Sequence, residues 1–350
     1  MESPILILDG GLGTSLEQKY GCTFDHTTPL WSSDLLVSEP ARLRQCQADF
    51  GRVPVDILQT ATYQVSVAGF AKTRDPEAAA DQQQGIPRER IPHYVDAAVR
   101  IAREAAPAPT TRLALSVGPY GACMLPSSQE YTGAYDADLS SEAALFAWHR
   151  DRLQLLAAAA AAGPDISFVA LETVPRVDEL RAMRRALAAT PALAAIPSWT
   201  SCLFPAGTDE DPRMPDGSDA AAALRAMLDP SVAAPSGGVG INCTRVGRRL
   251  DVLLERYEEA VAGLLREGVA ERWPALVLYP DGTNGEVYDT VTRTWVMAEE
   301  MGEGRGVSWA QQLAETVRRT RARGRWAQIV VGGCCRAGAE DIAALRAELL

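Results

Sequence analysis

The chain has 350 residues, of which 47% are hydrophobic and 6% aromatic. A chain of this length can bury a large core and can form one large domain or two. The net charge of −11 argues against a nucleic-acid groove or an anionic membrane surface as partner, because both require a basic footprint. Small molecules are therefore the expected partners, and the oligomeric state stays open.

The cysteine count and the N-terminus indicate a compartment. Seven cysteines without the spacing of a disulfide framework are typical of a reducing environment. The N-terminal residues 1–4 carry no basic region and lead directly into a short apolar run, so they do not resemble a signal peptide. No apolar run approaches the length that a bilayer span needs. We therefore expect a cytoplasmic protein.

Short apolar runs alternate with helical patterns along the whole chain. Strands are predicted at 5–8, 55–59, 113–117, 167–171, 195–199, 239–242, 275–279 and 328–331. Helices are predicted at 40–50, 94–105, 141–162, 177–189, 220–228, 249–266, 309–323 and 339–349. Eight strand–helix units of this kind predict an α/β protein with a closed (β/α)8 TIM barrel, formed as a single domain by residues 1–350.

An open doubly wound sheet would show the same alternation. The residues that follow the strands favour the closed barrel, because barrel enzymes place their active sites at the carboxyl ends of the strands. These residues are Asp9, Thr60, Gly118, Glu172, Thr200, Cys243, Asp281 and Cys334. Segments 73–90 and 204–218 contain turn residues and are predicted to be insertions on the barrel rim.

Three cysteines stand at predicted strand ends: Cys243, and the pair Cys334 and Cys335. Adjacent cysteines do not easily bridge each other, because a disulfide needs a Cα separation that neighbours reach only with a distorted peptide. The favoured interpretation is one soft metal ion, with zinc as the predicted ion. Three protein ligands leave one position open, which is typical of catalytic rather than structural zinc. The alternative is that these thiols are small buried hydrophobic groups.

Two acidic positions are further candidates. The turn 9–14 (Asp-Gly-Gly-Leu-Gly-Thr) is similar to a dinucleotide-binding loop, but Leu16 stands where the third glycine should be. A turn that exposes Asp9 and backbone amides to a small ligand is preferred. Glu172 ends an apolar strand, where a carboxylate costs free energy unless a cation pairs with it. That cation could be a ligand ammonium or a protein arginine.

Taken together, the motifs resemble the homocysteine S-methyltransferase family over nearly the whole chain. They are Asp9-Gly10-Gly11-x-Gly13-Thr14, Thr60-x-Thr62-Tyr63-Gln64, Gly118-Pro119-Tyr120-Gly121, Glu172-Thr173-Val174-Pro175, Gly240-Ile241-Asn242-Cys243, Tyr279-Pro280 with Gly285-Glu286-x-Tyr288-Asp289, and Gly332-Gly333-Cys334-Cys335-Arg336. The cysteine pair with its separated third cysteine is the most specific of these motifs.

The resemblance implies a TIM barrel and a set of site residues. For zinc these are Cys243, Cys334 and Cys335; for catalysis Glu172 and Asp9; and for substrate binding Asp9, Gly10, Tyr63, Glu172, Thr173 and Asn284. Glu172 is expected to bind the amino group of homocysteine. Many members have Tyr-Pro-Asn after the seventh strand, where this chain has Tyr279-Pro280-Asp281 and extra residues. Asp281 or Asn284 is therefore the candidate group to approach the fourth position of the zinc.

The resemblance also implies transfer of a methyl group from a sulfonium donor, S-methylmethionine or S-adenosylmethionine, to homocysteine, giving methionine. Three thiolates would leave the zinc centre anionic, which favours a cationic donor and a nucleophilic substrate sulfur. S-Methylmethionine is preferred because no separate adenosine-binding motif is present. This chemistry needs no histidine, and His149 is predicted to be structural. The alternatives are selenocysteine or selenohomocysteine as acceptor, betaine as donor, a non-catalytic zinc or redox protein, and a hydrolase that uses Asp9 and Glu172.

Overall fold

The computed structural model describes residues 2–25, 27–78, 85–106, 108–125, 128–160, 166–283, 286–289, 294–297 and 307–350. Eight parallel strands form the main sheet, in the order β1-β12-β9-β8-β5-β4-β3-β2. They are β1 (Ile5–Ile7), β2 (Ile57–Gln59), β3 (Arg112–Val117), β4 (Ile166–Val174), β5 (Ser198–Cys202), β8 (Gly238–Arg245), β9 (Ala275–Asp281) and β12 (Ile329–Val331). Each overlaps one of the eight predicted strands.

The first and last strands of this order also meet each other. Leu8 forms a parallel bridge with Ile57, and the N–H of Asp9 donates to the carbonyl of Ile57 at 3.1 Å. The N–H of Asp56 donates in turn to the carbonyl of Ile7 at 2.8 Å. The sheet therefore closes, and the predicted (β/α)8 barrel is confirmed.

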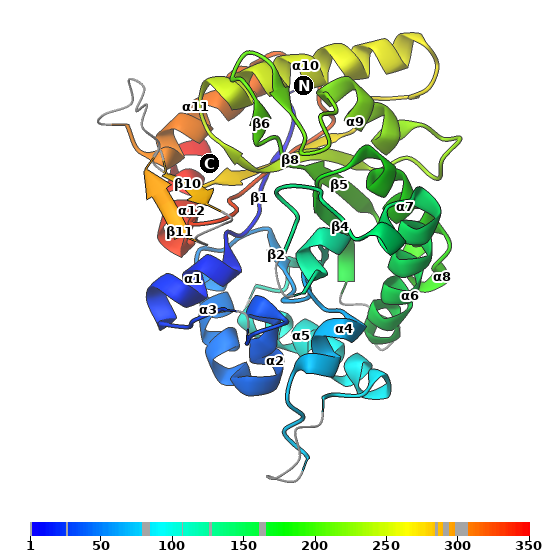
Figure 1. The fold of residues 1–350 in the computed structure, drawn as a ribbon. Coiled ribbons are helices and arrows are strands. Elements are labelled where there is room, and N and C mark those ends of the chain that lie inside the picture. Colours follow the sequence, from blue (N-terminus) through cyan, green and yellow to red (C-terminus); the bar gives the residue numbers. More distant parts are fainter. Residues whose placement is uncertain are drawn as a thin grey trace.

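Helices surround the strands on the outside of the barrel (Figure 1). They are α1 (Leu12–Tyr20), α2 (Leu35–Ser38), α3 (Pro40–Arg52), α4 (Val67–Lys72), α5 (Ile91–Ala105), α6 (Glu142–Ala160), α7 (Val177–Ala188), α8 (Pro191–Ala194), α9 (Ala220–Leu228), α10 (Arg248–Arg266), α11 (Trp309–Ala322) and α12 (Ala339–Leu349), with the short 3-10 turns η1 (Trp31–Asp34), η2 (Arg88–Arg90), η3 (Tyr120–Cys123) and η4 (Ala137–Leu139). All eight predicted helices are present. Local signals explain some boundaries: Ser308 and Gln311 form a capping box that begins α11, and α3 has a proline in its first turn.

The core has two layers, because side chains of a strand point alternately to its two faces. The barrel interior contains Leu8, Ile57, Ala114, Ala170, Trp199, Val277, Tyr279 and Val330. Between the strands and the helices lies a larger apolar cluster, to which Ile329 and Val331 of β12 belong. Val330 thus faces inward while its two neighbours face the helices. The filled interior leaves the carboxyl ends of the strands as the place for a cavity.

The rim carries short additional elements. The predicted insertion 204–218 contains a small antiparallel hairpin of β6 (Ala206–Gly207) and β7 (Pro212–Arg213). A second hairpin, β10 (Glu286–Asp289) with β11 (Thr294–Met297), follows β9 and was not predicted. Within the described parts of the chain, no helix combines the length and apolar character of a membrane span.

Three strand boundaries differ from the prediction in a way that matters for the site. β4 and β8 continue past residues 171 and 242, where the apolar runs end, so Glu172 and Cys243 lie within strands rather than after them. The pairing of β4 with β5 shifts register between Leu171 and Val174, and that of β8 with β9 shifts between Asn242 and Arg245. Both site residues therefore lie in irregular, bulged stretches, which re-aim side chains near active sites. β5 begins at Ser198, three residues later than predicted, because α8 and Pro197 occupy the preceding positions.

Candidate functional site

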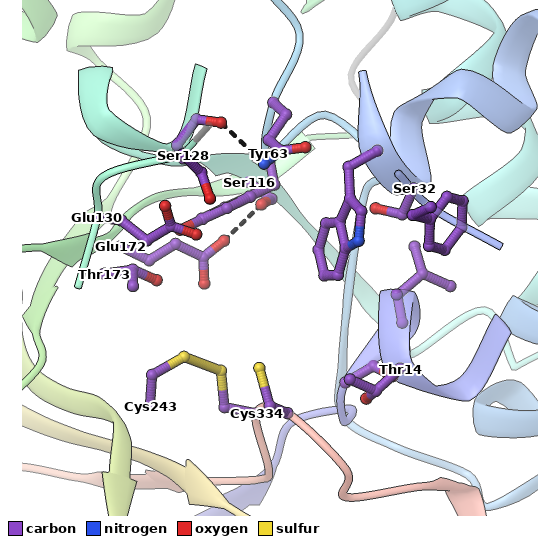
Figure 2. A pocket seen from close by; sticks show the side chains of 18 of the residues that line it. Thr14, Ser32, Tyr63, Ser116, Ser128, Glu130, Glu172, Thr173, Cys243 and Cys334 are labelled. Carbon is purple, nitrogen blue, oxygen red and sulfur yellow. Dashed lines mark hydrogen bonds between the residues drawn. A yellow bond between two sulfur atoms is a disulfide. The ribbon is translucent and has the colours of Figure 1, made fainter. Parts of the chain in front are cut away.

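A cavity of about 800 Å³ opens at the carboxyl ends of the strands. Figure 2 shows Glu130 and Glu172 on one wall, with Cys243 and Cys334 beneath them. The predicted site residues that line this cavity are Gly10, Tyr63, Glu172, Thr173, Cys243, Cys334 and Cys335. Asp9 lies directly behind this wall, and Asn284 lies outside the described residues. The cavity is large enough for more than one small substrate.

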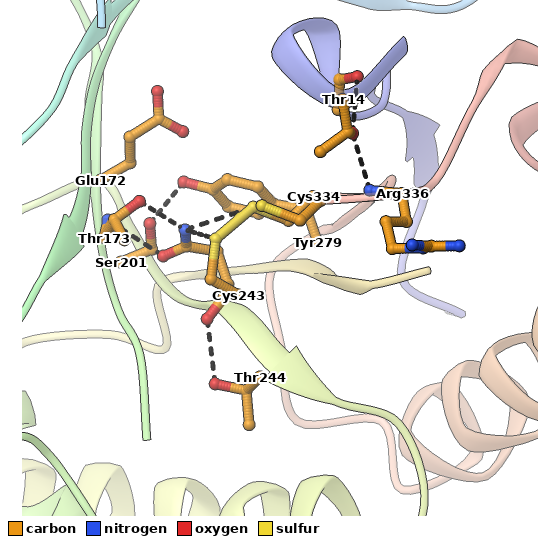
Figure 3. The surroundings of a disulfide bond; sticks show 12 residues. Thr14, Glu172, Thr173, Ser201, Cys243, Thr244, Tyr279, Cys334 and Arg336 are labelled. Carbon is orange, nitrogen blue, oxygen red and sulfur yellow. Dashed lines mark hydrogen bonds between the residues drawn. A yellow bond between two sulfur atoms is a disulfide. The ribbon is translucent and has the colours of Figure 1, made fainter. Parts of the chain in front are cut away.

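The three predicted cysteine ligands are gathered at one point, together with Asp281. One sulfur or carboxylate oxygen from each of Cys243, Asp281, Cys334 and Cys335 lies within 4.8 Å of the other three. Cys243 and Cys334 are joined by a disulfide (Figure 3), while Cys335 has a free thiol. The sequence did not indicate this disulfide, because the strand-end pattern does not report how close β8 and β12 bring two thiols.

These four groups fit a zinc site. Tetrahedral zinc has Zn–S bonds of about 2.3 Å, which separates two ligand sulfurs by roughly 3.8 Å and is compatible with the spacing of this cluster. Burial raises the pKa of the Cys335 thiol, so its thiolate needs a nearby cation. Burial also raises the pKa of Asp281 to about 7, and its Oδ1 accepts no hydrogen bond from the described protein. Metal binding and the disulfide are alternatives, because both use the sulfurs of Cys243 and Cys334.

Asn242 connects the cysteine cluster to the Glu172 strand. Its side-chain amide donates to Cys243 Sγ at 3.3 Å and to Thr173 Oγ1 at 2.7 Å, and its Oδ1 accepts from the N–H of Thr173 at 3.0 Å. Thr173 and Cys243 both have positive φ, of 59° and 43°. Such backbone conformations cost free energy for residues other than glycine and cluster at functional sites. The two bulged stretches are thus held together by one buried amide.

Glycines allow the turns after β1 and β12 to interlock. A Cβ atom on Gly11 would lie 2.3 Å from the carbonyl oxygen of Cys334, and one on Gly332 would lie 2.5 Å from that of Asp9. The N–H of Gly333 donates to the same Asp9 carbonyl at 3.0 Å. Side chains at these glycines would push the turns apart, so glycine is needed here for the close approach of the two backbones.

Glu172 is buried and held by neutral donors. Gln59 Nε2 donates to its Oε1 at 3.0 Å and to its Oε2 at 2.9 Å, and the hydroxyl of Ser116 donates to Oε1. Burial raises the pKa of Glu172, and these hydrogen bonds counteract only part of the shift. Among the described residues no arginine or lysine forms an ion pair with it. The protein-arginine alternative is therefore not supported, and a ligand cation would stabilise the charged form.

Asp9 forms a second buried carboxylate behind Gln59. Its Oδ2 accepts from the N–H of Gln59 at 2.9 Å, and its Oδ1 accepts no hydrogen bond from the described protein. Burial, and to a smaller degree the nearby Glu172, raise the pKa of Asp9 to about 8. Gln59 thus contacts both carboxylates, one through its backbone and one through its side chain. Asp9 therefore positions Gln59, and through Gln59 it can affect a ligand bound at Glu172.

Several residues of the site were not predicted from the sequence. Gln59 and Ser116 lie at or near the ends of β2 and β3, so the rule that pointed to Glu172 could also have found them. Glu130 lies in a loop without periodicity, and no sequence signal indicated it. His149 is fully buried in α6 with Nε2 2.8 Å from Oε1 of Glu179, in agreement with its predicted structural role.

The comparisons with known proteins agree with this geometry. The family model described as homocysteine S-methyltransferase matches residues 6–349. The chain belongs to the homocysteine S-methyltransferase family. A homocysteine S-methyltransferase of Escherichia coli (strain K12) is 32% identical over 354 residues, covering 98% of this chain and 94% of that protein. A betaine-homocysteine S-methyltransferase of Drosophila melanogaster is 29% identical, covering 98% and 93%.

Solved structures of one family member have the same fold. The homocysteine methyltransferase MmuM from Escherichia coli in its metallated form superposes with a TM-score of 0.67 at 27% identity, covering 98% of this chain and 96% of that one. Its oxidized form gives a TM-score of 0.65 at 29% identity, covering 98% and 95%. This chain is accordingly an enzyme, a methyltransferase of the homocysteine S-methyltransferase family.

Proposed function

We propose that this enzyme transfers a methyl group from a sulfonium donor, S-methylmethionine or S-adenosylmethionine, to the sulfur of homocysteine, and that zinc on Cys243, Cys334 and Cys335 is required. The single observation that carries the proposal is that this cysteine cluster and the Glu172 carboxylate line the same cavity. Homocysteine has a thiol at one end and an ammonium group at the other. One substrate molecule could therefore occupy both positions.

Glu172 is the proposed partner of the homocysteine ammonium. Gln59 and Ser116 hold its carboxylate in place before the substrate binds, so little side-chain entropy is lost on binding. An ammonium beside a buried carboxylate favours its charged form. Asp9 supports the same wall through the backbone of Gln59. This arrangement would fix the orientation of homocysteine and direct its sulfur toward the cysteine cluster.

Zinc on the three cysteines would supply the positive charge that lowers the pKa of the homocysteine thiol. The homocysteine thiol would lose its proton to solvent on binding, and a sulfur lone pair would then form the new bond to the methyl carbon. The bond between that carbon and the donor sulfur breaks, and its electron pair stays on the donor as a neutral thioether. No general base is needed in this step, and none of the described histidines lines the cavity.

The experiment is a donor panel with the reduced, zinc-loaded protein. Methionine formation from homocysteine is measured with S-methylmethionine, S-adenosylmethionine, betaine and methyltetrahydrofolate at equal concentrations. We expect turnover with the sulfonium donors, S-methylmethionine being the better one, and little with the other two. Substantial turnover with betaine or the folate alone would overturn the proposed donor class. Selenohomocysteine and selenocysteine, tested in place of homocysteine, measure the acceptor range.

A further inference from the structure

We infer that Glu130 binds the α-ammonium group of the methyl donor and thereby selects amino-acid sulfonium donors over donors without N–H groups. This inference rests on the proposed function, because it assigns a residue to the second substrate of the same cavity. It concerns a residue on a loop, away from the strand ends that carry the cysteines and Glu172.

Glu130 lies close to the cysteine cluster. It belongs to the loop between η3 and η4 and lines the same cavity as Glu172 (Figure 2). The hydroxyl of the next residue, Tyr131, is 3.8 Å from Cys335 Sγ. A donor whose sulfonium faces the cysteine cluster would therefore have the rest of its chain near this loop. Two methylene groups separate sulfur from the α-carbon in methionine-derived donors, which keeps their ammonium close to the reacting methyl group.

The hydrogen bonding of Glu130 is incomplete, unlike that of Glu172. Its Oε2 is buried and accepts no hydrogen bond from the described protein, whereas both oxygens of Glu172 accept from Gln59. A buried acceptor without a donor costs about 1–3 kcal/mol. Burial accordingly raises the pKa of Glu130 to about 7, partly offset by its own backbone N–H and by Ser128. A ligand N–H that reaches Oε2 would remove this cost.

The chemistry of the missing partner follows from the acceptor. An α-ammonium group brings both a positive charge and N–H donors, as in S-methylmethionine and S-adenosylmethionine. The quaternary nitrogen of betaine brings the charge but no N–H, so it would leave Oε2 without a hydrogen bond. Carboxylates outnumber guanidinium groups on the cavity wall: Glu17, Asp25, Glu130 and Glu172 against Arg336. The resulting potential favours a cationic second substrate.

The loop that carries Glu130 is anchored by a buried acid. Glu179 accepts from the N–H of Tyr120 at 2.6 Å and from the hydroxyl of Tyr135. Within the loop, the N–H of Gln129 donates to the carbonyl of Gly121 at 2.8 Å. These contacts hold the loop on both sides of Glu130. Its carboxylate is therefore positioned before a ligand arrives.

The test compares two donors that differ in one group, S-methylmethionine and 4-(dimethylsulfonio)butanoate, which lacks only the amino group. Both are assayed with wild type, Glu130→Gln and the matched control Glu17→Gln, which removes another carboxylate from the same wall. We expect Glu130→Gln to raise the KM for S-methylmethionine at least about tenfold. Its KM for the des-amino donor and for homocysteine should change less than about twofold. Glu17→Gln should change the KM values of the two donors by the same factor.

Several results would overturn the inference. One is that Glu130→Gln raises the KM of both donors by the same factor. Another is that it raises the KM of neither donor. The inference would also be overturned if the wild type uses the des-amino donor and S-methylmethionine equally well. This comparison does not depend on whether the variant folds. Calorimetric binding of S-methylmethionine to wild type and Glu130→Gln gives a readout without turnover. If wild type forms no methionine from any sulfonium donor, the proposed function fails, while the calorimetric comparison still tests Glu130.

Discussion

Two parts of the cavity wall hold acidic side chains in different ways: the part formed by the strand ends, called the floor below, and the part formed by the loop between η3 and η4, called the rim. On the floor, Glu172 lies in a strand paired on both sides, and Gln59 and Ser116 donate to its oxygens. On the rim, Glu130 lies in a loop attached through Glu179, and its Oε2 has no donor among the described residues. Under the proposed function, the floor binds homocysteine and holds the metal ligands, while the rim selects which donor is used. Changes to the floor should therefore remove activity, and changes to the rim should alter selectivity.

The largest effect is expected at the cysteine cluster. Cys334→Ala removes one of the three proposed zinc ligands, so methyl transfer should be abolished and the zinc content should fall well below one per chain. Metal analysis and methionine formation measure the two effects, with the half-buried Cys22→Ala as control. A Cys334→Ala, Cys335→Ala double variant that retains stoichiometric zinc would contradict the metal assignment. Hydrolytic activity that survives the loss of Cys334 would favour the alternative of a hydrolase that uses Asp9 and Glu172.

The next effect concerns Glu172. Glu172→Gln retains the shape of the side chain but removes the charge proposed to face the homocysteine ammonium. Homocysteine binding should weaken by about 1–3 kcal/mol, while zinc content stays the same. The KM for homocysteine measures the change, and Glu17→Gln, which removes a different carboxylate from the lining of the same cavity, serves as a control. An unchanged KM in Glu172→Gln would rule out the proposed contact.

A smaller effect, on stability, is expected for Asp9. The pKa of Asp9 is about 8 in the folded chain, against an ordinary value of 3.8 for a solvated aspartate. Between about pH 4 and about pH 8 the folded chain therefore retains a proton that the unfolded chain loses. The free energy of unfolding contributed by Asp9 therefore falls as the pH rises from about 4 to about 8. Asp9→Asn can still accept from the N–H of Gln59, so it should be more stable than wild type at pH 8 by about 1–3 kcal/mol. Urea unfolding at pH 5 and pH 8 measures this, and parallel pH profiles of the two proteins would contradict it.

The smallest effect should come from the anchor of the rim loop. Tyr135→Phe removes one hydrogen bond to the buried Glu179, which should lower the free energy of unfolding by about 1–2 kcal/mol. The KM of the donor should rise a few-fold as the loop loosens, with the KM of homocysteine unchanged. Tyr120→Phe is the matched control, because it removes the exposed hydrogen bond of the Tyr120 hydroxyl to Asp136 while the backbone N–H of residue 120 still donates to Glu179. A larger effect on homocysteine than on the donor would argue against separate roles for floor and rim.

Much of the fold could be predicted from the sequence, because the strands and helices of a barrel have local sequence patterns. Apolar runs of strand length and helical periodicity predicted all eight strands and eight helices, and the strand-end rule predicted that Cys243, Cys334 and Glu172 meet at one cavity. The helices α1, α2, α4 and α8, the hairpins β6–β7 and β10–β11 and the late start of β5 were not predicted, because short elements carry little periodic signal.

The sequence by itself determined the barrel, the family and the side chains proposed for the chemistry, since these depend on residue type, order and local pattern. Only the tertiary structure decided that Glu172 and Cys243 lie in bulged stretches joined by Asn242, and that Glu130 lines the cavity with an oxygen that accepts no hydrogen bond from the described residues. The physical reason is that a hydrogen bond between distant segments depends on strand register and loop path. A one-residue change in register reverses the face to which a side chain points, and no local pattern reports it.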